Sequence, residues 1–538
     1  MKNYIGIIIA IGFFVVQSFL ARGTGMSWDE PQNFFNGRKT LKFFLSGDRR
    51  YVDTWGDAKL FDGDHMAYLY ADAHYPPGAG FIGSVFSSVL SDYLHLVSWI
   101  DGYHIGEVAI GAVGVGTFYY LGVLLGLSPF ISLVTTLLFG LYPTIFGEMR
   151  ADAKDLPMMS GLIVFMYLFL RWVKSSHVWW GIGAAVALGF AAWMKLTAPI
   201  VLVPITVWAV AAWFGSSTFR KSLSPISRIL ILLPFFLVIS CTVVYLLWPY
   251  LWNDSVARLT AAWEFFRIVG MGNAVLYLGK YYQAGINLPW HYPLIILAVQ
   301  TPVEILVLAF VGIIAVWRLW PKKDVYPLLI FIWFVVGIGR FALPHMVIYA
   351  KIRHFIDVVP AFFLLVGFGL QIIQKMRYVY LPVHFFLAAL SLMLVHLIWI
   401  DVIYYPYEPS YFNFLVGGTK TVAQRQLFDV EHWATGTREA MQFVNREKGE
   451  KTVYGCGLNH IARQYAESHV RVEATPQLGS YVLVPNMPSV FTDALYVYNT
   501  YHTLVHTIRR AGADLFYVYR TTASHTLICS GEVVTGDD

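Results

Sequence analysis

The sequence predicts a polytopic α-helical membrane protein with about 11 transmembrane helices, followed by a small C-terminal α/β domain. Composition is the first sign, because 57% of the 538 residues are hydrophobic and only 13% are charged, against about 25% charged residues in a soluble chain. Charge is costly in lipid, so the deficit indicates many membrane spans. The second sign is the end of the long apolar runs after Ile400. We therefore divide the chain into a membrane domain, 1–400, and a C-terminal domain, 401–538.

Each candidate span is a stretch of about 20 mostly apolar residues, the length that crosses a bilayer. Eleven stretches qualify: 4–20, 104–125, 129–147, 156–173, 178–194, 197–214, 229–247, 291–317, 325–343, 355–374 and 380–400. With the N-terminus in the cytoplasm, every cytoplasmic loop after the first is basic, as the positive-inside rule requires. The C-terminal domain then lies on the extracytoplasmic face. The semi-apolar segment 78–98 is predicted to lie on the membrane surface.

Charged residues that the positive-inside rule does not explain gather on the outer face. The first outer loop, 21–103, is rich in acids, whereas loops 148–155 and 344–354 supply bases. Acids and bases therefore face one another across a single outer surface. This is how an active site at a membrane interface would be built.

Asp29 and Glu30 follow the first span directly, just ahead of Pro31. In one interpretation a carboxylate here is a general base that removes a proton from an acceptor hydroxyl or amine, most effectively when partial burial raises its pKa. In the other, the acid pair begins a helix. The two interpretations are compatible with each other.

A second charged group lies before the span 156–173 and consists of Arg150, Asp152, Lys154 and Asp155. Two cations at the mouth of a span could bind a phosphate, since charge-assisted hydrogen bonds to phosphate are strong. The alternative is an ordinary helix start, in which Asp155 caps the helix that follows.

Two further sites on the outer face offer bases or rings. Arg353 and His354 begin the span 355–374, where Arg353 would capture a lipid-linked phosphate or, alternatively, extend its charge to the interface. His74 precedes the turn Pro76-Pro77. That turn either presents the His74 ring to a ligand or has a purely structural role.

The C-terminal domain is predicted from short alternating elements. Strands are expected at 451–456, 480–484 and 514–519, and amphipathic helices at 434–447 and 500–511. This alternation is typical of a small α/β domain.

Cofactor and metal signals are weak. Cys456 and Cys529 either form a disulfide on an extracytoplasmic face or stay as buried free thiols. The segment 62–65, Asp-Gly-Asp-His, could ligate a divalent cation, yet no ligand spacing typical of a metal site is recognisable and none is predicted. No nucleotide-binding fingerprint is present, and the net charge of +5 follows loop position rather than indicating nucleic-acid binding.

The order of these motifs resembles the GT-C class of membrane glycosyltransferases. Within that class the chain is similar to the dolichyl-phosphate-mannose protein mannosyltransferases and the lipid A aminoarabinose transferases (glycosyltransferase families 39 and 83). The matching segments run from the start of the chain to about residue 440: Ser27-Trp28-Asp29-Glu30, His74-Tyr75-Pro76-Pro77, Arg150 to Pro157, Leu288 to Pro293, Ile352-Arg353-His354-Phe355, and Tyr407 to Asn413 with Gly417-Gly418. The chain departs from the family where Tyr75 separates His74 from Pro76, and at Glu431-His432-Trp433-Ala434, where many members have an Asp-Tyr-Trp-Gly-like tetrad.

The resemblance implies a GT-C fold, a polyprenyl-phosphate sugar donor, inversion at the anomeric carbon, and no required nucleotide. We expect the reaction to be independent of a metal or only weakly dependent on one, with a divalent cation as the candidate cofactor. The resemblance also implies that Asp29 is the catalytic base, with Glu30 and Asp155 as further acids of the site. Arg353 would bind the donor phosphate, with Arg150 and Lys154 as weaker candidates and His74 and His354 nearby. A bacterial inner membrane is the expected location, with a glycan, a lipid or a protein as acceptor.

Two rival hypotheses stay open. A transporter or lipid flippase would show internal repeats or charges in mid-membrane, but Glu304 is the main acid deep within a predicted span and no repeat is visible. A non-catalytic scaffold acting through its C-terminal domain would leave the acids of the outer face unexplained.

Overall fold

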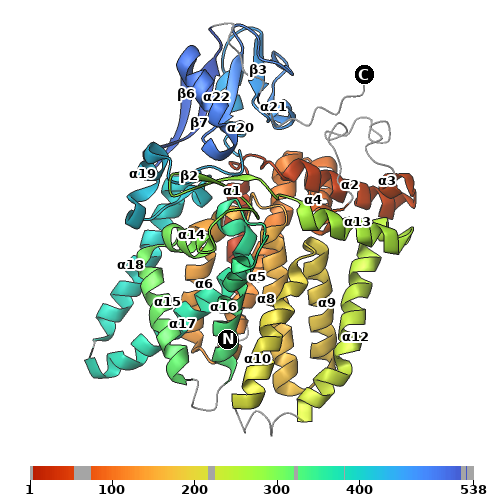
Figure 1. Ribbon diagram of the computed structural model, residues 1–538, viewed down its shortest axis with the longest axis vertical. Helices are drawn as coiled ribbons and strands as arrows, with labels where there is room; N and C mark the ends of the chain where they lie inside the picture. The colour runs from red at the N-terminus through yellow and green to blue at the C-terminus, as the bar shows by residue number, and fades with distance from the viewer. Residues whose placement is uncertain are drawn as a thin grey trace.

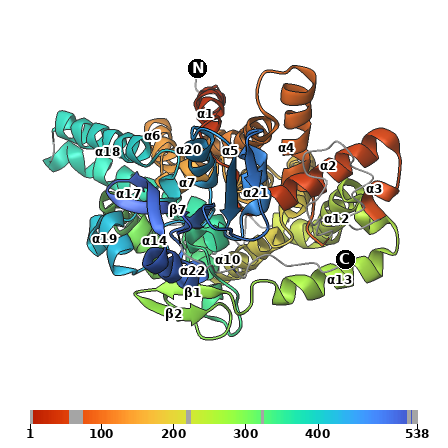
Figure 2. The same cartoon turned by 90° about the horizontal axis from the view of Figure 1, so that it is seen from above.

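The computed structural model describes residues 4–53, 74–215, 224–319, 325–380, 382–522 and 529. A bundle of apolar helices runs along the long axis of the molecule, and a small sheet lies above one end of it (Figure 1). A layer of short helices and a hairpin lies between the two and extends across the end of the bundle, as the view from above shows (Figure 2). We call this the outer end of the bundle.

One half of the bundle is a row of helices in which each packs on the next: α1 (Ile5–Ala21), α5 (Trp99–Leu124), α8 (Asp155–Ser175), α9 (Val178–Met194) and α12 (Ser224–Leu247). Small residues allow this close approach. A Cβ atom on Gly116 of α5 would lie 2.5 Å from the carbonyl oxygen of Gly6 in α1, so a larger residue at this position would force the two helices apart.

The other half of the bundle is organised around one buried helix, α17 (Val359–Tyr380). It packs against α15 (Val303–Leu319), α16 (Tyr326–Gly339) and α6 (Pro129–Gly140), and α16 also contacts α10 (Leu202–Gly215) of the first half. By contrast, α18 (Val383–Tyr404) diverges from the bundle (Figure 1) and exposes much of its apolar surface.

Four helices of the described residues are long and apolar enough to cross a membrane: Trp99–Leu124, Asp155–Ser175, Lys351–Met376 and Val383–Tyr404. Seven shorter apolar helices accompany them: Ile5–Ala21, Pro129–Gly140, Val178–Met194, Ala198–Phe214, Pro234–Leu247, Val303–Trp317 and Tyr326–Ala342. Each of the eleven expected spans overlaps one of these helices. That all eleven cross the bilayer stays a prediction.

Two expected spans are not single helices. The segment 291–317 breaks at Pro302 into α14 (Tyr292–Gln300) and α15, because proline has no backbone N–H to donate. The amide nitrogen of Asn413 donates to the carbonyl oxygens of Ala298 (2.7 Å) and Thr301 (2.6 Å), which satisfies groups that the break leaves free. The segment 129–147 divides in the same way before Pro143, into α6 and α7 (Pro143–Glu148).

The layer across the outer end is built from residues 30–53, 78–93 and 255–283. It contains α2 (Glu30–Ser46), α3 (Arg50–Asp53), α4 (Gly78–Ser87) with the π-helical turn Ser88–Tyr93, α13 (Ser255–Ile268), and the hairpin of β1 (Ala274–Tyr277) and β2 (Lys280–Gln283). Helix α4 packs on α2 and α5. Glycine is required where α2 and α4 cross, because a Cβ atom on Gly37 would lie 1.9 Å from the carbonyl carbon of Gly80. The placement of 78–98 on a membrane surface stays a prediction.

The C-terminal region contains a five-stranded sheet in the order β4-β3-β5-β7-β6. Its strands are β3 (Lys451–Gly455), β4 (Val470–Val472), β5 (Tyr481–Pro485), β6 (Thr503–Arg510) and β7 (Ala513–Arg520). Strand β3 is parallel to both of its neighbours, whereas β7 is antiparallel to β5 and β6. The helices of this region are α19 (Gly418–Arg425), α20 (Thr437–Asn445), α21 (Asn459–Tyr465) and α22 (Pro488–Tyr501).

The three strands expected at 451–456, 480–484 and 514–519 are present, and α20 lies within the expected helix 434–447. The helix expected at 500–511 is wrong, because this segment is the end of α22 followed by β6. A two-residue turn decides the structure here. Ala511 and Gly512 both have positive φ (47° and 74°), the geometry of a tight hairpin, so β6 pairs directly with β7.

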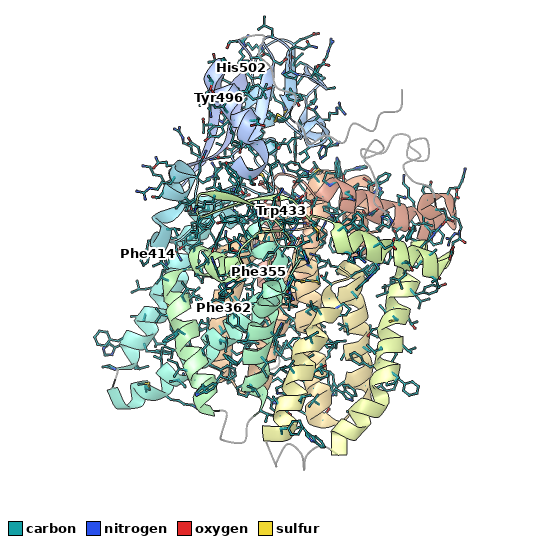
Figure 3. The ribbon with its side chains drawn as sticks, viewed as in Figure 1. Phe355, Phe362, Phe414, Trp433, Tyr496 and His502 are labelled. Atoms are coloured by element: carbon teal, nitrogen blue, oxygen red, sulfur yellow. A yellow bond between two sulfur atoms is a disulfide. The ribbon has the colours of Figure 1, made fainter. Side chains whose placement is uncertain are left out.

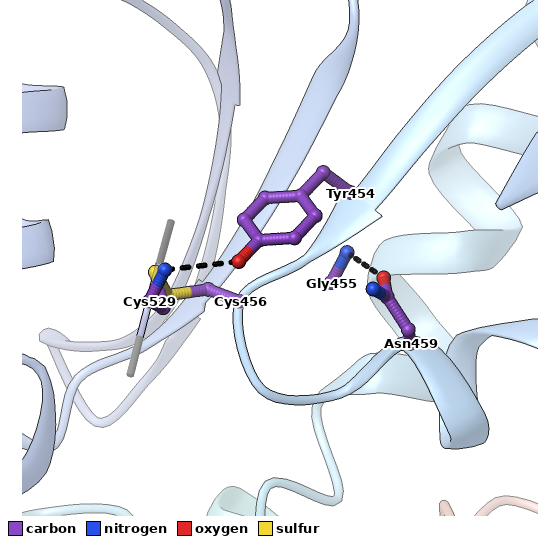
Figure 4. The surroundings of a disulfide bond; sticks show 5 residues. All are labelled: Tyr454, Gly455, Cys456, Asn459 and Cys529. Carbon is purple, nitrogen blue, oxygen red and sulfur yellow. Dashed lines mark hydrogen bonds between the residues drawn. A yellow bond between two sulfur atoms is a disulfide. The ribbon is translucent and has the colours of Figure 1, made fainter. Parts of the chain in front are cut away.

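A disulfide between Cys456 and Cys529 joins the end of the chain to the residue after β3 (Figure 4). The alternative of two buried free thiols is therefore wrong. The backbone N–H of Cys529 donates to the hydroxyl of Tyr454 (2.9 Å), and Asn459 accepts a hydrogen bond from the N–H of Gly455 (2.7 Å). Cys456 packs in an apolar cluster with Val482 and Tyr498, on one face of the sheet.

Candidate active site

Four chain segments that are far apart in the sequence meet at the outer end of the bundle. They are the turn between α1 and α2, the turn before α8, the residue after α9, and the 3₁₀ segment Lys351–Val358 before α17. Together they supply five charged side chains: Asp29 from the first, Lys154 and Asp155 from the second, Lys195 from the third and Arg353 from the fourth. We call these five side chains the charged cluster.

Asp29 is the acid of the cluster that reaches open space. Its side chain is 25% exposed, and Oδ2 binds both Lys154 Nζ (3.0 Å) and the guanidinium of Arg353. Burial works to raise the pKa of the Asp29 carboxyl, but Arg353 and Lys154 outweigh it and hold that pKa well below its usual range. Asp29 is therefore ionised at neutral pH and is shared between two cations.

Asp155 lies beneath Asp29 and has no exposed side-chain surface. Its Oδ2 accepts a hydrogen bond from Arg353 Nε (2.8 Å), and its Oδ1 binds Lys195 Nζ. Arg353 thus bridges the two aspartates and fixes the distance between them. Its guanidinium also lies 4.4 Å from the ring centroid of Trp433, an arrangement that favours a cation.

The turn before α8 is held by Asp152 rather than by Asp155. The carboxylate of Asp152 accepts hydrogen bonds from the backbone N–H groups of Lys154 (3.1 Å), Asp155 (2.8 Å) and Leu156 (3.1 Å). The expectation that Asp155 caps this helix is therefore wrong. Because Asp152 carries the cap, the side chains of Lys154 and Asp155 are free to join the charged cluster.

Glu30 points away from Asp29 into the protein. Its side chain is 1% exposed, and Oε2 accepts from the backbone N–H of Ser27 (2.9 Å) and pairs with Nε2 of His104 (3.0 Å). The Ser27 contact ties Glu30, the first residue of α2, back to the turn that precedes this helix. Burial raises the pKa of Glu30 well above its usual value. The arrangement makes Glu30 a support of the turn that presents Asp29.

The structure does not bring Arg150 into the charged cluster. Its side chain is fully buried and makes two hydrogen bonds of 2.7 Å to Glu408, one of 3.0 Å to Thr24, and further bonds to Gln17 and the carbonyl of Phe146. All three guanidinium nitrogens have partners within the protein. This geometry argues against the expected phosphate-binding role and indicates a structural one.

The two histidines expected at the site have different surroundings. The His354 ring is packed 4.2 Å from the ring of Tyr349, and its Nε2 has no hydrogen-bond partner among the described residues. His74 stacks on Phe265 of α13 at 5.1 Å. The residue of this turn that reaches the charged cluster is Tyr75, because Lys154 Nζ lies 4.3 Å from its ring centroid.

Asp29 and Arg353 line a cavity of about 520 Å³ between the bundle and the C-terminal region. Figure 3 shows Trp433, another lining residue, where the two parts meet, with Phe355 and Phe362 deeper in the bundle. The volume lies within the range of small-molecule sites. The remaining walls are strongly aromatic and carry a few charges; they include Trp28, Tyr292, Tyr349, Phe428, Lys351, Asp429 and His432.

The site also contains four residues that the sequence did not single out as candidates: Lys195, Tyr75, Lys351 and Trp433. Trp433 was visible only as part of the altered tetrad 431–434. The possible cation ligands at 62–65 lie outside the described residues. Elsewhere in the described chain no group of three or more His, Cys, Asp or Glu side chains could hold a metal ion.

Comparison with known proteins supports the fold. No protein-family model and no curated protein sequence matches this chain. Among solved structures, the chain is similar to the oligosaccharyltransferase of Archaeoglobus fulgidus tethered to an acceptor peptide, with a TM-score of 0.50 and 12% identity over 94% of this chain and 74% of the other. It is also similar to apo ArnT from Cupriavidus metallidurans, with a TM-score of 0.49 and 15% identity over 96% and 97% of the two chains. The likeness to the oligosaccharyltransferase shows that the chain has the expected GT-C fold.

Proposed function

We propose that the protein is an integral membrane glycosyltransferase that moves a sugar from a polyprenyl-phosphate donor to an acceptor on the outer face of the membrane. One observation carries this proposal: Asp29, an ionised acid at the wall of a 520 Å³ cavity, is held between the cations Lys154 and Arg353. A base beside two cations suits a reaction in which an acceptor loses a proton and a phosphate leaves. The GT-C fold, shared with an oligosaccharyltransferase, supports the same reaction class.

In the proposed reaction Asp29 takes the proton of an acceptor hydroxyl or amine. The acceptor's lone pair then attacks the anomeric carbon of the donor sugar from the side opposite the phosphate. The bond between that carbon and the phosphate oxygen breaks, and polyprenyl phosphate leaves with the electron pair. A single displacement of this kind inverts the anomeric carbon.

The departing phosphate gains negative charge, so it needs cations more than it needs an acid. Arg353, Lys154 and Lys195 surround the two aspartates and supply positive charge that can stabilise the departing phosphate. This supports a reaction that does not depend on a metal ion. We assign Asp155 and Glu30 to positioning, since Asp155 orients Arg353 and Lys195 while Glu30 holds the turn of Asp29.

Donor binding would also activate the base. In the free protein both cations bind Asp29 and lower its pKa, which makes it a weak base. A donor phosphate that takes over Arg353 and Lys154 would release Asp29 from them and raise its pKa. The base would then gain strength only when a donor is present.

For the location we propose a bacterial inner membrane, with the N-terminus in the cytoplasm and the C-terminal region outside. The Cys456–Cys529 disulfide supports this orientation, because disulfides persist in oxidising compartments. A glycan, a lipid or a protein each fits the proposed acceptor. A transporter or flippase has less support, since the charged cluster lies at the ends of α8, α9 and α17 rather than in the middle of these helices.

The test is sugar transfer by the purified protein, with a panel of polyprenyl-phosphate sugars and membrane extract as acceptor, comparing wild type with Asp29→Asn. Asp53→Asn is a matched control, because Asp53 is 27% exposed and is also held by two cations, Arg49 and Arg258. We expect transfer by wild type and Asp53→Asn, and a loss of about 100-fold or more in Asp29→Asn. Equal transfer by all three proteins would refute the role of Asp29. Movement of labelled lipid across proteoliposomes without transfer would favour the flippase.

A further inference from the structure

A second cavity, of about 340 Å³, lies beside the C-terminal region at the outer end of the bundle. Its lining residues come from three places: Gly23 after α1, Tyr405 and Pro406 after α18, and one face of α20 with β6. It shares no lining residue with the catalytic cavity. Its position follows from the fold, since the ends of α1 and α18 are joined where the Tyr405 hydroxyl donates to the carbonyl oxygen of Leu20 (2.7 Å).

Arginine dominates the polar lining of this cavity, which carries Arg438, Arg446, Arg510 and a single acid, Glu439. Two of the arginines already have partners. Arg438 pairs with Asp101 (2.8 Å), and Arg510 pairs with Glu439 (2.8 Å).

Arg446 differs from the other two arginines. Its side chain makes no hydrogen bond or ion pair with any part of the chain that the structure describes, although its backbone N–H bonds to Phe443. The exposed amide of Gln442 lies one helical turn before it on α20, and the ring of His506 stacks on Phe443 at 4.4 Å. The cavity therefore presents one cation, the exposed guanidinium of Arg446, beside the amide of Gln442, and no described residue bonds to either side chain. Such a lining suits a phosphate group.

The cavity lies at the level where two apolar helices end. On the last turns of α1, Phe19 is 75% exposed, and on the last turn of α18, Val402 is 71% exposed. If these helices cross the bilayer, their exposed apolar side chains face acyl chains, whereas the cavity just beyond their ends faces lipid headgroups. A ligand with a phosphate head and apolar chains matches both surfaces at once.

We propose that this cavity binds the phosphate headgroup of an anionic membrane lipid, with Arg446 as its main ligand. The acyl chains of the lipid lie along the exposed ends of α1 and α18. Because α20 and β6 belong to the C-terminal region while Gly23 and Tyr405 belong to the bundle, a bound lipid fastens one part to the other. The proposal does not depend on the glycosyltransferase reaction, since it concerns a separate cavity.

The experiment measures binding of short-chain lipids to the purified full-length protein in detergent by native mass spectrometry. The probes are dioctanoyl phosphatidylglycerol, the zwitterionic dioctanoyl phosphatidylcholine, and glycerol phosphate, which is a headgroup without chains. The variants are Arg446→Ala and the control Arg471→Ala, which removes the same charge from an exposed arginine paired with exposed Glu450.

We expect phosphatidylglycerol to bind more tightly than either of the other probes. Arg446→Ala should weaken its binding by about 10-fold or more, whereas Arg471→Ala should leave it unchanged. Arg353→Gln, in the catalytic cavity, should also leave it unchanged, which separates this site from binding of a lipid donor. Equal binding of phosphatidylcholine, equal binding of glycerol phosphate, or an unaltered affinity in Arg446→Ala would each overturn the proposal.

Discussion

Replacing Arg353 by glutamine tests whether the charged cluster acts on a leaving phosphate. The substitution removes the bridge between Asp29 and Asp155 and the cation above Trp433. Glutamine keeps a neutral donor near the position of Arg353 Nε, which faces Asp155, but is too short to reach Asp29, so the change removes the charge and the contact with Asp29 together. The prediction rests on the proposed function and concerns both folding and rate.

The expected loss of stability is moderate. Removing one partner of a buried ion pair costs about 3–5 kcal/mol when it leaves a buried charge alone. Here each aspartate keeps a lysine, since Lys154 stays on Asp29 and Lys195 stays on Asp155. We therefore expect the low end of that range, about 3 kcal/mol. The expected loss of rate is larger, about 100- to 1000-fold in kcat, the usual effect of removing one group that stabilises developing negative charge.

The assay combines thermal unfolding in detergent with sugar transfer at saturating donor. Arg258→Gln is the control, because Arg258 is 18% exposed and binds Asp53 at 2.9 Å in the same outer layer, away from both aspartates of the cluster. It should lose at most about 1 kcal/mol, as partly exposed pairs do, and should keep its kcat. If Arg353→Gln were folded and transferred sugar as fast as Arg258→Gln, the assignment of the phosphate site would be refuted.

Three further predictions follow from buried groups outside the charged cluster. Burial raises the pKa of the Glu431 carboxyl to about 7 from 4.5, so its protonated form is favoured in the folded protein. The contribution of Glu431 to the free energy of unfolding should be complete below pH 4.5 and should fall by about 3 kcal/mol as the pH rises through 7. Thermal unfolding at a series of pH values should show this decline in wild type and a flatter one in Glu431→Gln. Arg150→Gln leaves the carboxylate of fully buried Glu408 without its cation and should lower the free energy of unfolding by about 3–5 kcal/mol, while the folded fraction keeps its kcat. A specific loss of donor affinity in this variant would instead indicate that Arg150 binds the donor. Reducing the Cys456–Cys529 disulfide releases a loop of 73 residues and should destabilise the C-terminal region by about 4 kcal/mol. Thiol labelling of the unfolded protein should then rise from one cysteine to three. Three reactive thiols before reduction would contradict the disulfide.

The helical elements were predictable because burial in lipid leaves a strong local signal. Each of the eleven expected spans overlaps an apolar helix, since a bilayer selects long apolar stretches whatever their neighbours are. The breaks within two of them were missed, because a proline in an apolar run is compatible with a kink or with a break. What decides between the two is a distant partner, as when Asn413 takes up the carbonyl groups next to Pro302.

The hairpin of β6 and β7 in the C-terminal sheet could not be predicted from the local sequence. Residues 500–511 have the composition of an amphipathic helix, yet β6 forms because β7 offers a partner strand across a two-residue turn. Strand formation depends on that pairing more than on the propensity of the segment itself. The register, and with it the place of Arg510 beside Glu439, therefore depends on tertiary structure.

The sequence by itself determined the membrane class, the position of the acidic pair after the first span, and the identity of Asp29, Lys154, Asp155 and Arg353 as candidates. Only the tertiary structure decided which of the charged side chains in these segments reach the cavity. Asp29 and Glu30 are neighbours in the chain, yet one reaches the cavity and the other is buried against His104. Lys154 and Arg150 lie four positions apart, but Arg150 is taken up by Glu408, which follows it by 258 residues. The physical reason is that an ion pair is fixed by distance in space and by burial, and neither is written in the local sequence.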